Sequence, residues 1–572
     1  MDIKHVLAKI ITGFITDTAG IDSSTIESYI EVPPSRDMGD YALPCFKLSR
    51  TMRKSPQAIA NDLLEKSLRK NEPAFANIIA SCKVEGGYFN IFINRAEYIK
   101  GVMSEIIGAG DRHGSSAAGA GKRVIVEYSA PNIAKPFHVG HLCSTAIGNS
   151  IKRIYDFLGY ETVSINHIGD WGTQFGKAIC AYRRWGDGEA LANDAIHELL
   201  RVYVLFHKKA KEMPELEDEA RNIFLRLEEG EEDIVAQWKE FCDLSIVELR
   251  RMYDRLGVSF DSYAGESFYS DKMGEIVELL EERGLLAESE GAKIVDLSEL
   301  GITSCIIIKS DGATIYATRD LAAALYRKRT YDFYKNIYVV GNPQALHFKQ
   351  LLAILGLMGF EWSKDCVHVG HGYVRLPGRK MATREGEIIE LEELLDEAVK
   401  RAKTMMDEER GLDDPEKVAE DVGVGAIIYS FLKNGREKDT VFTWTEMLDI
   451  KGDSGPYLQY TCARASSVLR RAGEMPDRAD YSLLASDEEY EIVDLLNAYP
   501  NIILDAADKY EPSILARHIF TLARAFNKFY NLHKVIDSEP GLRDARLHLC
   551  GAVRAVLGKG LYLLGIKALD RM

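Results

Sequence analysis

One segment constrains the fold of this chain more than any other: SAPNIAKPFHVGH, residues 129–141. It lies between an apolar run typical of a strand, 124–128, and an amphipathic pattern typical of a helix, 142–158. A strand that leads through a polar loop into a helix is the repeating unit of a parallel α/β sheet. The unpaired N–H groups and positive potential at the start of such a helix attract phosphate. The sequence therefore predicts a phosphate-binding loop at this point.

Two histidines and a glycine, His138, Gly140 and His141, stand where that helix begins. Imidazole can donate to phosphate oxygens, and glycine lets a flat base approach the backbone. The same tetrapeptide, HVGH, recurs at 368–371, but no helical pattern follows it, so we expect a strand and a loop there. A chance match or a structural histidine pair is one alternative for such a tetrapeptide. A zinc site is another, but the chain has no CxxC motif and neither copy reads HExxH. The first copy therefore predicts a nucleoside-triphosphate site, without a bound metal.

Length and composition are those of an ordinary multidomain globular protein. The 572 residues are enough for several domains of ~100–200 residues, and no apolar run reaches the ~18 residues of a membrane span. The nine scattered cysteines are typical of reduced thiols in a cytoplasm. The net charge of −16 argues against non-specific coating of nucleic acid but leaves room for a local RNA-binding face. We therefore expect a cytoplasmic protein without a membrane or DNA partner.

The hydrophobic pattern divides the chain into successive parts. Residues 1–108 are predicted to form a small α+β domain, which a linker rich in Gly, Ala and Ser follows. Strands and helices alternate over 122–390, as in a parallel α/β sheet, with a helical and β insertion at about 177–330. The later patterns are helical, and they predict a connecting region at 391–451 and an all-helical domain at 452–572.

A second motif, NHIGDWGTQFG at 166–176, follows the second predicted strand of the sheet. Small residues beside one aromatic ring suit the ligand-facing end of a strand. The candidate ligand-facing residues are Gly169, Asp170, Trp171 and Gln174. A buried tryptophan at a tight turn explains the motif equally well, so both interpretations stay open.

The motif YATRD, residues 316–320, contains a candidate site for a cationic substrate. If a helix starts near Thr318, Tyr316 and Asp320 lie four residues apart and face the same pocket. A buried carboxylate there can bind a guanidinium through two parallel hydrogen bonds. The alternative is that Asp320 pairs with Arg319 or caps the helix.

Two more motifs follow later strands. Gln344, in VGNPQALHF, stands where a strand opens a helix and can give a neutral hydrogen bond, although it can equally be a solvent-exposed helix residue. Lys380 and Arg384 belong to GRKMATREG, a short basic loop. Cations on a loop can stabilise the charge that develops on a leaving pyrophosphate, and a generic basic surface loop is the alternative.

Together these motifs resemble those of the arginyl-tRNA synthetases, which are class I aminoacyl-tRNA synthetases. The resemblance covers nearly the whole chain, and SAPNIAKPFHVGH, NHIGDWGTQFG and YATRD are its most specific parts. It implies a Rossmann-type catalytic domain, an N-terminal domain that contacts the tRNA elbow, and a helical anticodon-binding domain. The class I KMSKS loop reads KMATR here, with Thr383 in place of its second lysine, and Cys143 and Pro343 are further departures.

The resemblance also implies the reaction. The carboxylate of L-arginine attacks the α-phosphorus of ATP, pyrophosphate leaves, and arginyl-adenylate then passes arginine to the terminal ribose of tRNA(Arg). Such chemistry depends on positioning and charge stabilisation more than on a protein nucleophile. ATP with Mg²⁺, L-arginine and tRNA(Arg) are the implied partners, and we expect a monomer.

The same resemblance distributes the site residues between two substrates. Those expected to act on ATP are Lys135, His138, Gly140, His141, Lys380 and Arg384. Those expected to hold arginine are Glu127, Asn132, Tyr316, Asp320 and Gln344. A further hypothesis is that Lys135 replaces the lysine missing at position 383. Two alternatives remain: a non-catalytic tRNA-binding or regulatory protein on a synthetase scaffold, and a synthetase for another amino acid.

Overall fold

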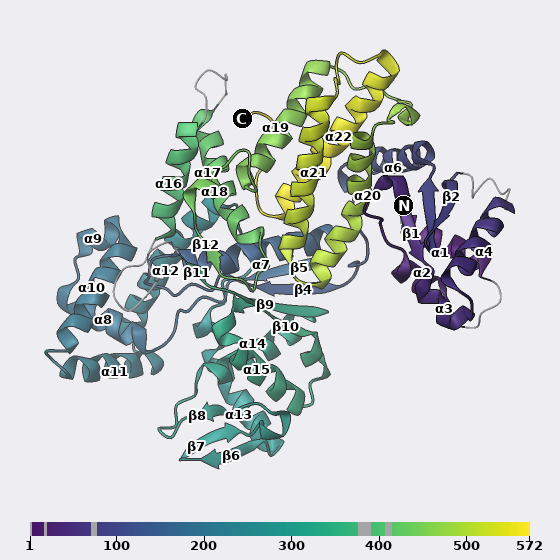
Figure 1. Cartoon of the computed structure of the whole chain (residues 1–572). Helices are drawn as coiled ribbons and strands as arrows, with labels where there is room; N and C mark the ends of the chain where they lie inside the picture. Colours follow the sequence, from purple (N-terminus) through teal and green to yellow (C-terminus); the bar gives the residue numbers. More distant parts are fainter. Residues whose placement is uncertain (1–2, 16–19, 70–76, 376–389, 406–413) are drawn as a thin grey trace.

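The computed structural model describes residues 3–15, 20–69, 77–375, 390–405 and 414–572. In Figure 1 the parallel sheet lies at the centre, a helical bundle stands above it, and the N-terminal domain lies beside that bundle. The predicted class, α/β with an N-terminal α+β domain and a C-terminal all-helical domain, is confirmed.

The N-terminal domain is a three-stranded antiparallel sheet, in the order β1-β3-β2, covered by helices. A turn at Gly86 and Gly87, both with positive φ, leads into its last strand. Because glycine adopts positive φ without strain, the pair permits the hairpin there. The elements are α1 (Ile3–Phe14), α2 (Ser23–Tyr29), β1 (Tyr41–Pro44), α3 (Phe46–Met52), α4 (Pro56–Arg69), β2 (Ile79–Glu85), β3 (Tyr88–Ile93) and α6 (Arg95–Ala109).

Four parallel strands form the central sheet, in the order β10-β9-β4-β5. The chain leaves β4 through α7 to β5 on one side and later returns as β9 on the other side of β4. Such a reversal opens a crevice at the carboxyl ends of the strands, where ligands bind in sheets of this kind. The elements are β4 (Arg123–Glu127), α7 (Val139–Phe157), β5 (Glu161–Ile165), β9 (Lys335–Gly341), α15 (Ala345–Leu357) and β10 (Cys366–His371).

The insertion has a helical half and a β half, as the sequence predicts. Its helices are α8 (Thr173–Trp185), α9 (Gly188–Asn193), α10 (Ala195–Ala210), α11 (Glu215–Glu228), α12 (Glu232–Leu256) and α13 (Met273–Glu282). An antiparallel sheet follows, formed by β6 (Leu286–Ser289), β7 (Ala292–Val295) and β8 (Cys305–Ile308). The chain then turns through Gly312, at φ +84°, and enters α14 (Tyr316–Tyr331), which returns it to the central sheet.

The rest of the described chain is almost entirely helical. Its elements are β11 (Val374–Arg375), α16 (Leu391–Met405), α17 (Pro415–Leu432), β12 (Thr440–Val441), α18 (Trp444–Met447), α19 (Gly455–Ala472), α20 (Asp487–Asp508), α21 (Pro512–Leu532) and α22 (Pro540–Leu563). The predicted breaks near 452–456 and 473–480 are confirmed, because α19 starts after Ser454 and ends before Gly473.

Contacts between α6 and α20 join the N-terminal domain to the helical bundle (Figure 1). The hydroxyl of Tyr98 donates to Asp494 at 2.9 Å, and Arg95 pairs with Asp487 at 2.8 Å while lying over the ring of Tyr490.

None of the helices in the described ranges is long and apolar enough to cross a membrane. The cysteines all lie in these ranges as free thiols.

Candidate active site

The loop between β4 and α7 has a strained backbone. Ser129, Ala130 and Ala134 have φ values of 76°, 47° and 59°, in the left-handed region that side chains other than glycine rarely adopt. Such strain persists only where surrounding contacts hold it, and it concentrates at functional sites. This loop is the segment that the sequence predicts to bind phosphate.

A buried polar network holds the loop in place. The phenol of Tyr253, on α12, contacts the Ser129 hydroxyl at 2.7 Å and accepts from the Asn166 side chain at 2.9 Å. The Ser129 backbone N–H donates to Ser144, on α7, at 3.0 Å. The Ala130 N–H donates to Asn166 at 3.1 Å. Helices α7 and α12 and the loop after β5 therefore fix the strained residues together.

His138 and His141 form a reciprocal cap at the start of α7. The Nδ1 atom of His138 accepts from the Gly140 N–H at 3.0 Å, and Nδ1 of His141 accepts from the His138 N–H at 3.4 Å. A neutral imidazole has one acceptor and one donor nitrogen, so both rings must carry their proton on Nε2. The rings stack with centroids 3.8 Å apart. Both histidines are thus arranged as Nε2–H donors beside a helix N-terminus.

Electrostatics keep both rings neutral. Burial, with a smaller contribution from Lys135, lowers the pKa of His138 to about 4. Burial, with smaller contributions from the neighbouring His138 and Lys135, also lowers the pKa of His141 well below its usual value of 6.5. At neutral pH the pair therefore donates hydrogen bonds without carrying charge of its own.

Gly140 has a steric reason to be glycine. A Cβ atom there would lie 2.8 Å from Cε1 and 2.9 Å from Nδ1 of the His138 ring. The ring can cap the helix only because this space is empty. The helix also begins at Val139, three residues before the predicted start, because His138 caps it.

Asn132 and Gly169 join the first two motifs. They form a parallel bridge, and the Gly169 N–H donates to the carbonyl of Pro131 at 3.0 Å. A Cβ on Gly169 would lie 2.4 Å from the Asn132 Oδ1 atom, so any larger residue would displace the Asn132 side chain from its present position. Both residues lie at the crevice side of the sheet, and a direct role in binding arginine stays a prediction for Asn132.

The next residues of the second motif make structural contacts. Asp170 is buried, and its carboxylate accepts from the N–H and hydroxyl of Ser267 at 2.8 and 2.6 Å. Trp171 packs edge-to-face against Phe224 and Trp238. Trp171 is half-buried, so it is a packed but not a fully buried residue of this turn, and whether either residue also faces a ligand stays a prediction. Gln174, in the first turn of α8, is partly exposed, and its role is likewise untested.

Glu127, at the end of β4, forms an ion pair with Arg327 of α14. Both side chains are buried, with relative exposures of 6% and 0% for the two residues. Burial opposes the charge on Arg327, but the proximity of Glu127 outweighs it, and the pKa of Arg327 lies well above its usual value. The sequence reasoning assigned Glu127 to the substrate arginine, and a guanidinium of the chain itself is its partner here.

Asp320 lies between two histidines. His347 Nε2 contacts Oδ2 of Asp320 at 2.6 Å, and His167 Nε2 lies 3.6 Å from Oδ1. The ring of Tyr316 meets that of His347 edge-to-face at 4.9 Å, so Tyr316 and Asp320 do share one face of α14, which begins at Tyr316 and not near Thr318. Burial raises the pKa of Asp320, but the hydrogen bond from His347 and the proximity of His167 and Arg327 outweigh burial and leave it lowered.

Gln344 ends the short turn before α15 and is exposed to solvent. Pro343, the departure noted in the sequence, is the middle residue of this turn, Asn342–Gln344. A contact of Gln344 with arginine stays a prediction.

The second HVGH is in β10, as expected, and does not start a helix. The Nε2 atom of His368 bonds to the Val340 carbonyl at 2.9 Å, and the ring stacks on Phe348 at 4.6 Å. His371 bonds to the carbonyl of Gly372 at 2.9 Å. These rings bond to backbone carbonyls, whereas the rings that cap α7 accept from backbone N–H groups.

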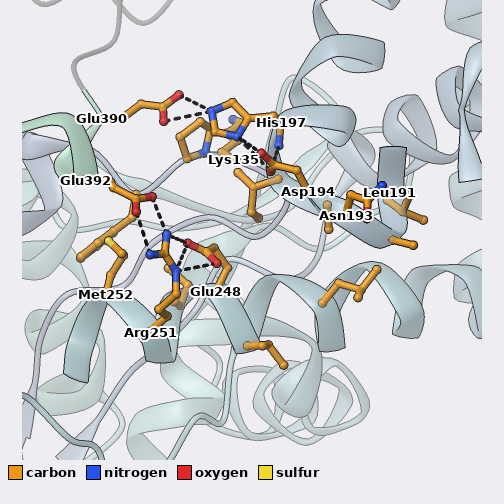
Figure 2. Close-up of a pocket in the computed structure, with 18 residues that line it drawn as sticks. Lys135, Leu191, Asn193, Asp194, His197, Glu248, Arg251, Met252, Glu390 and Glu392 are labelled. Carbon is orange, nitrogen blue, oxygen red and sulfur yellow. Dashed lines mark hydrogen bonds and ion pairs between the residues drawn. The ribbon is translucent and has the colours of Figure 1, made fainter. Parts of the chain in front are cut away.

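Lys135 lines a cavity of about 410 Å³ behind the α7 loop (Figure 2). Its ammonium lies over the ring of Tyr203 at 5.6 Å, and burial lowers its pKa. Lys380 and Arg384 lie outside the described residues, so the cations of the KMATR loop stay predictions.

Two groups of ion pairs line the same cavity (Figure 2). His197 lies between Asp194, at 2.9 Å, and Glu390, at 3.1 Å. Arg251 binds Glu392 of α16 and its own helix neighbour Glu248. The Leu391 N–H donates to the Phe137 carbonyl at 2.8 Å, so the segment before α16 pairs with the α7 loop.

Several residues that build the site were not assigned from the sequence. Arg327 lies seven positions after Asp320, a helical spacing that places both on one face of α14. His167 and His347 lie inside the second motif and the Gln344 motif. Tyr253 had no local signal, because it reaches the loop from a distant helix.

A parallel sheet whose first crossover helix begins with HVGH, followed by a helical bundle, defines the catalytic core of a class I aminoacyl-tRNA synthetase. Residues 103–444 match the family of class I tRNA synthetases (R), catalytic domain. Residues 458–572 match the DALR anticodon binding domain, and residues 2–93 match the arginyl tRNA synthetase N terminal domain. The chain belongs to the arginyl-tRNA synthetase family.

Relatives of known name agree over the full length. The arginine–tRNA ligase of Clostridium botulinum (strain 657 / Type Ba4) is 50% identical, with 100% of both chains covered, and that of Clostridium acetobutylicum is 48% identical with the same coverage. Among solved structures, Thermus thermophilus arginyl-tRNA synthetase matches with a TM-score of 0.80 at 26% identity, covering 100% of both chains. The arginyl-tRNA synthetase of Plasmodium falciparum, at 23% identity and a TM-score of 0.79, covers 100% of this chain and 99% of its own and supports the fold.

Proposed function

We propose that this protein is an arginine–tRNA ligase that activates L-arginine with ATP and transfers it to tRNA(Arg). One observation carries the proposal: the neutral His138/His141 cap and the Asp320 cluster both lie at the carboxyl edge of one parallel sheet. The first is suited to phosphate, the second to a guanidinium. Full-length identity to arginine–tRNA ligases supports the same reaction. The non-catalytic alternative does not explain why the His138/His141 donor pair and the Asp320 carboxylate lie at the same edge of the sheet.

ATP is bound at the start of α7. The Nε2–H groups of His138 and His141 donate to phosphate oxygens, and the helix N-terminus adds positive potential. Lys135, with Lys380 and Arg384, neutralises the charge that develops on pyrophosphate. Mg²⁺ arrives with ATP as part of the co-substrate. Among the described residues, no group of three or more His, Cys, Asp or Glu side chains is placed to hold a metal ion.

Arginine is bound next to the ATP site. Asp320 pairs with the substrate guanidinium through two parallel hydrogen bonds, with Tyr316 and Gln344 beside it. Asn132 and Glu127 complete the pocket at the end of β4. Because Glu127 is already paired with Arg327, its contribution to arginine is shared with that guanidinium.

A second cavity suits a tRNA base. It has a volume of about 450 Å³ and lies in the helical bundle, between α19, α21 and the C-terminal residues. The guanidinium of Arg464 lies over the rings of Tyr460 and Tyr530, at 4.8 and 5.0 Å. Aromatic rings and an arginine together stack unpaired bases, so this surface complements the tRNA-binding role of the anticodon-binding domain.

Aminoacylation of total tRNA, with each amino acid supplied in turn, tests the proposal. We expect incorporation of arginine alone, by a cytoplasmic monomer. ATP–pyrophosphate exchange with and without tRNA then separates a catalyst from a protein that only binds tRNA. Absence of both activities in the folded protein would support the non-catalytic alternative, and charging with another amino acid would contradict the substrate.

A further inference from the structure

The carboxylate of Asp320 belongs to a buried chain of charged and imidazole groups. Glu127 pairs with Arg327, Arg327 Nη2 lies 3.4 Å from Nδ1 of His167, and Nε2 of His167 faces Asp320. His347 contacts the far oxygen of Asp320. The five groups come from β4, α14, α15 and the loop after β5, and they meet at the carboxyl edge of the sheet.

Hydrogen-bond chemistry fixes where the protons of the histidines lie. A guanidinium only donates, so Nδ1 of His167 must accept from Arg327, and its proton is on Nε2. A carboxylate only accepts, so Nε2 of His347 must carry the proton that it donates to Asp320 Oδ2, at 2.6 Å. In the neutral ring, Nδ1 of His347 is then a bare acceptor. It is buried and has no hydrogen-bond partner within the described ranges.

The net charge of these five interacting side chains leaves room for one cation. Glu127 and Asp320 contribute two negative charges and Arg327 one positive charge, so with neutral imidazoles the net charge is −1. The substrate guanidinium brings it to zero. His347 contacts Oδ2, while at Oδ1 the side-chain donor found within the described ranges, His167, is 3.6 Å away, beyond normal hydrogen-bond length. The less occupied oxygen of Asp320 is therefore the one available to a substrate.

We propose that His347 is a specificity-determining positioning residue: its Nε2–H fixes Oδ2 of Asp320, so that Oδ1 is presented to the guanidinium of arginine. The inference rests on the proposed function, in which Asp320 binds that guanidinium. Two ring contacts hold His347 in this role: it lies edge-to-face against Tyr316 at 4.9 Å and against Phe348 at 5.2 Å. The residue is 8% exposed.

Two amide substitutions test the donor position. His347→Gln places an amide N–H near the position of Nε2, whereas His347→Asn places it near Nδ1. Steady-state aminoacylation of tRNA(Arg) with the full chain, varying arginine and then ATP, measures both. We expect His347→Asn to raise the arginine KM by about 10-fold or more, the scale of losing one hydrogen bond to a charged group. His347→Gln should stay within about 3-fold of wild type, and the KM for ATP should change in neither.

His368→Gln is the matched control. His368 stacks on Phe348, the sequence neighbour of His347, but its ring bonds to a backbone carbonyl and pairs with no carboxylate in the described part of the chain. We expect a near-normal arginine KM in this variant. Equal arginine KM values for His347→Asn and His347→Gln, an equal rise in the KM for ATP, or the same defect in His368→Gln would each overturn the inference.

Asp320→Asn separates this inference from the proposed function. If Asp320→Asn impairs arginine use and His347→Asn does not, only the role of His347 is overturned. If Asp320→Asn leaves arginine use normal, Asp320 is not in the pocket, and both assignments are overturned together.

Discussion

Removing the guanidinium of Arg327 leaves a buried carboxylate without a partner. Arg327→Met keeps much of the side-chain volume but removes the charge. Glu127 is only 6% exposed, so water cannot replace the lost guanidinium unless this region opens locally. We expect the region around β4 and α14 to be destabilised in this variant more than by most single substitutions.

The expected magnitude follows from the burial of both ions. Removing one partner of a buried ion pair costs about 3–5 kcal/mol, because the other charge stays desolvated. Replacing both partners with neutral groups of similar volume is often close to neutral. The double variant Glu127→Gln/Arg327→Met should therefore regain most of the stability that Arg327→Met loses. The difference between the single and double variants measures the coupling of the pair.

Hydrogen exchange of peptides from β4 and α14 is the suitable assay. The chain has several domains, so one unfolding midpoint would mix their transitions, whereas exchange reports the local opening free energy. At tenfold per ~1.4 kcal/mol, the single variant should exchange roughly 10²- to 10³-fold faster in these peptides. Exchange within threefold of wild type in Arg327→Met, or a double variant no slower than the single one, would refute the reasoning.

The remaining predictions concern the ATP half of the site. His138→Ala or His141→Ala should lower pyrophosphate exchange by ~10²-fold or more, the scale of losing a transition-state donor, whereas His368→Ala should act mainly on stability; equal catalytic losses in folded proteins would show that the wrong HVGH was chosen. Lys135→Ala should lower kcat more than it raises the arginine KM, and Thr383→Lys should partly restore it; unchanged exchange in Lys135→Ala would remove the compensation hypothesis. The depressed pKa of His138, about 4, makes the folded state bind fewer protons than the unfolded state, so its contribution to stability is complete above about pH 6.5 and is lost as pH falls towards 4. A local opening free energy of α7, measured by hydrogen exchange, with the same pH dependence in His138→Gln as in wild type over that window would contradict this.

The sequence predicts much of the fold because its strongest patterns are local. Apolar strand runs between amphipathic helices indicated the parallel sheet, and the helix after His138 was found within three residues. The miss at that boundary arises from the cap, whose ring replaces the side-chain oxygen that usually marks a helix start. Strand β6 was not predicted, because three of its four residues are exposed and it carries no clear alternation.

The site was predictable only where a motif carries it. His138, Gly140 and Asp320 stand in recognisable segments, and their roles in binding ATP and arginine stay predictions. The sequence did not predict the partners that hold other site residues in place, because these partners are distant in the chain. Arg327 lies 200 positions after its ion-pair partner Glu127, and Tyr253 lies 124 positions after its hydrogen-bond partner Ser129. Pairings of this kind depend on how helices pack on the sheet, which local periodicity does not specify.

The most direct test of the account is the selectivity of Asp320→Asn, measured as kcat/KM for arginine, lysine and citrulline in aminoacylation of tRNA(Arg). Arginine presents a planar, permanently charged fork, and a site built to pair with it can reject a poorer partner by ~10⁴-fold. The account predicts that Asp320→Asn loses most of its arginine use with the KM for ATP nearly unchanged, and that citrulline in the variant does not reach the rate of arginine in wild type. A normal kcat and KM for arginine in Asp320→Asn would contradict it.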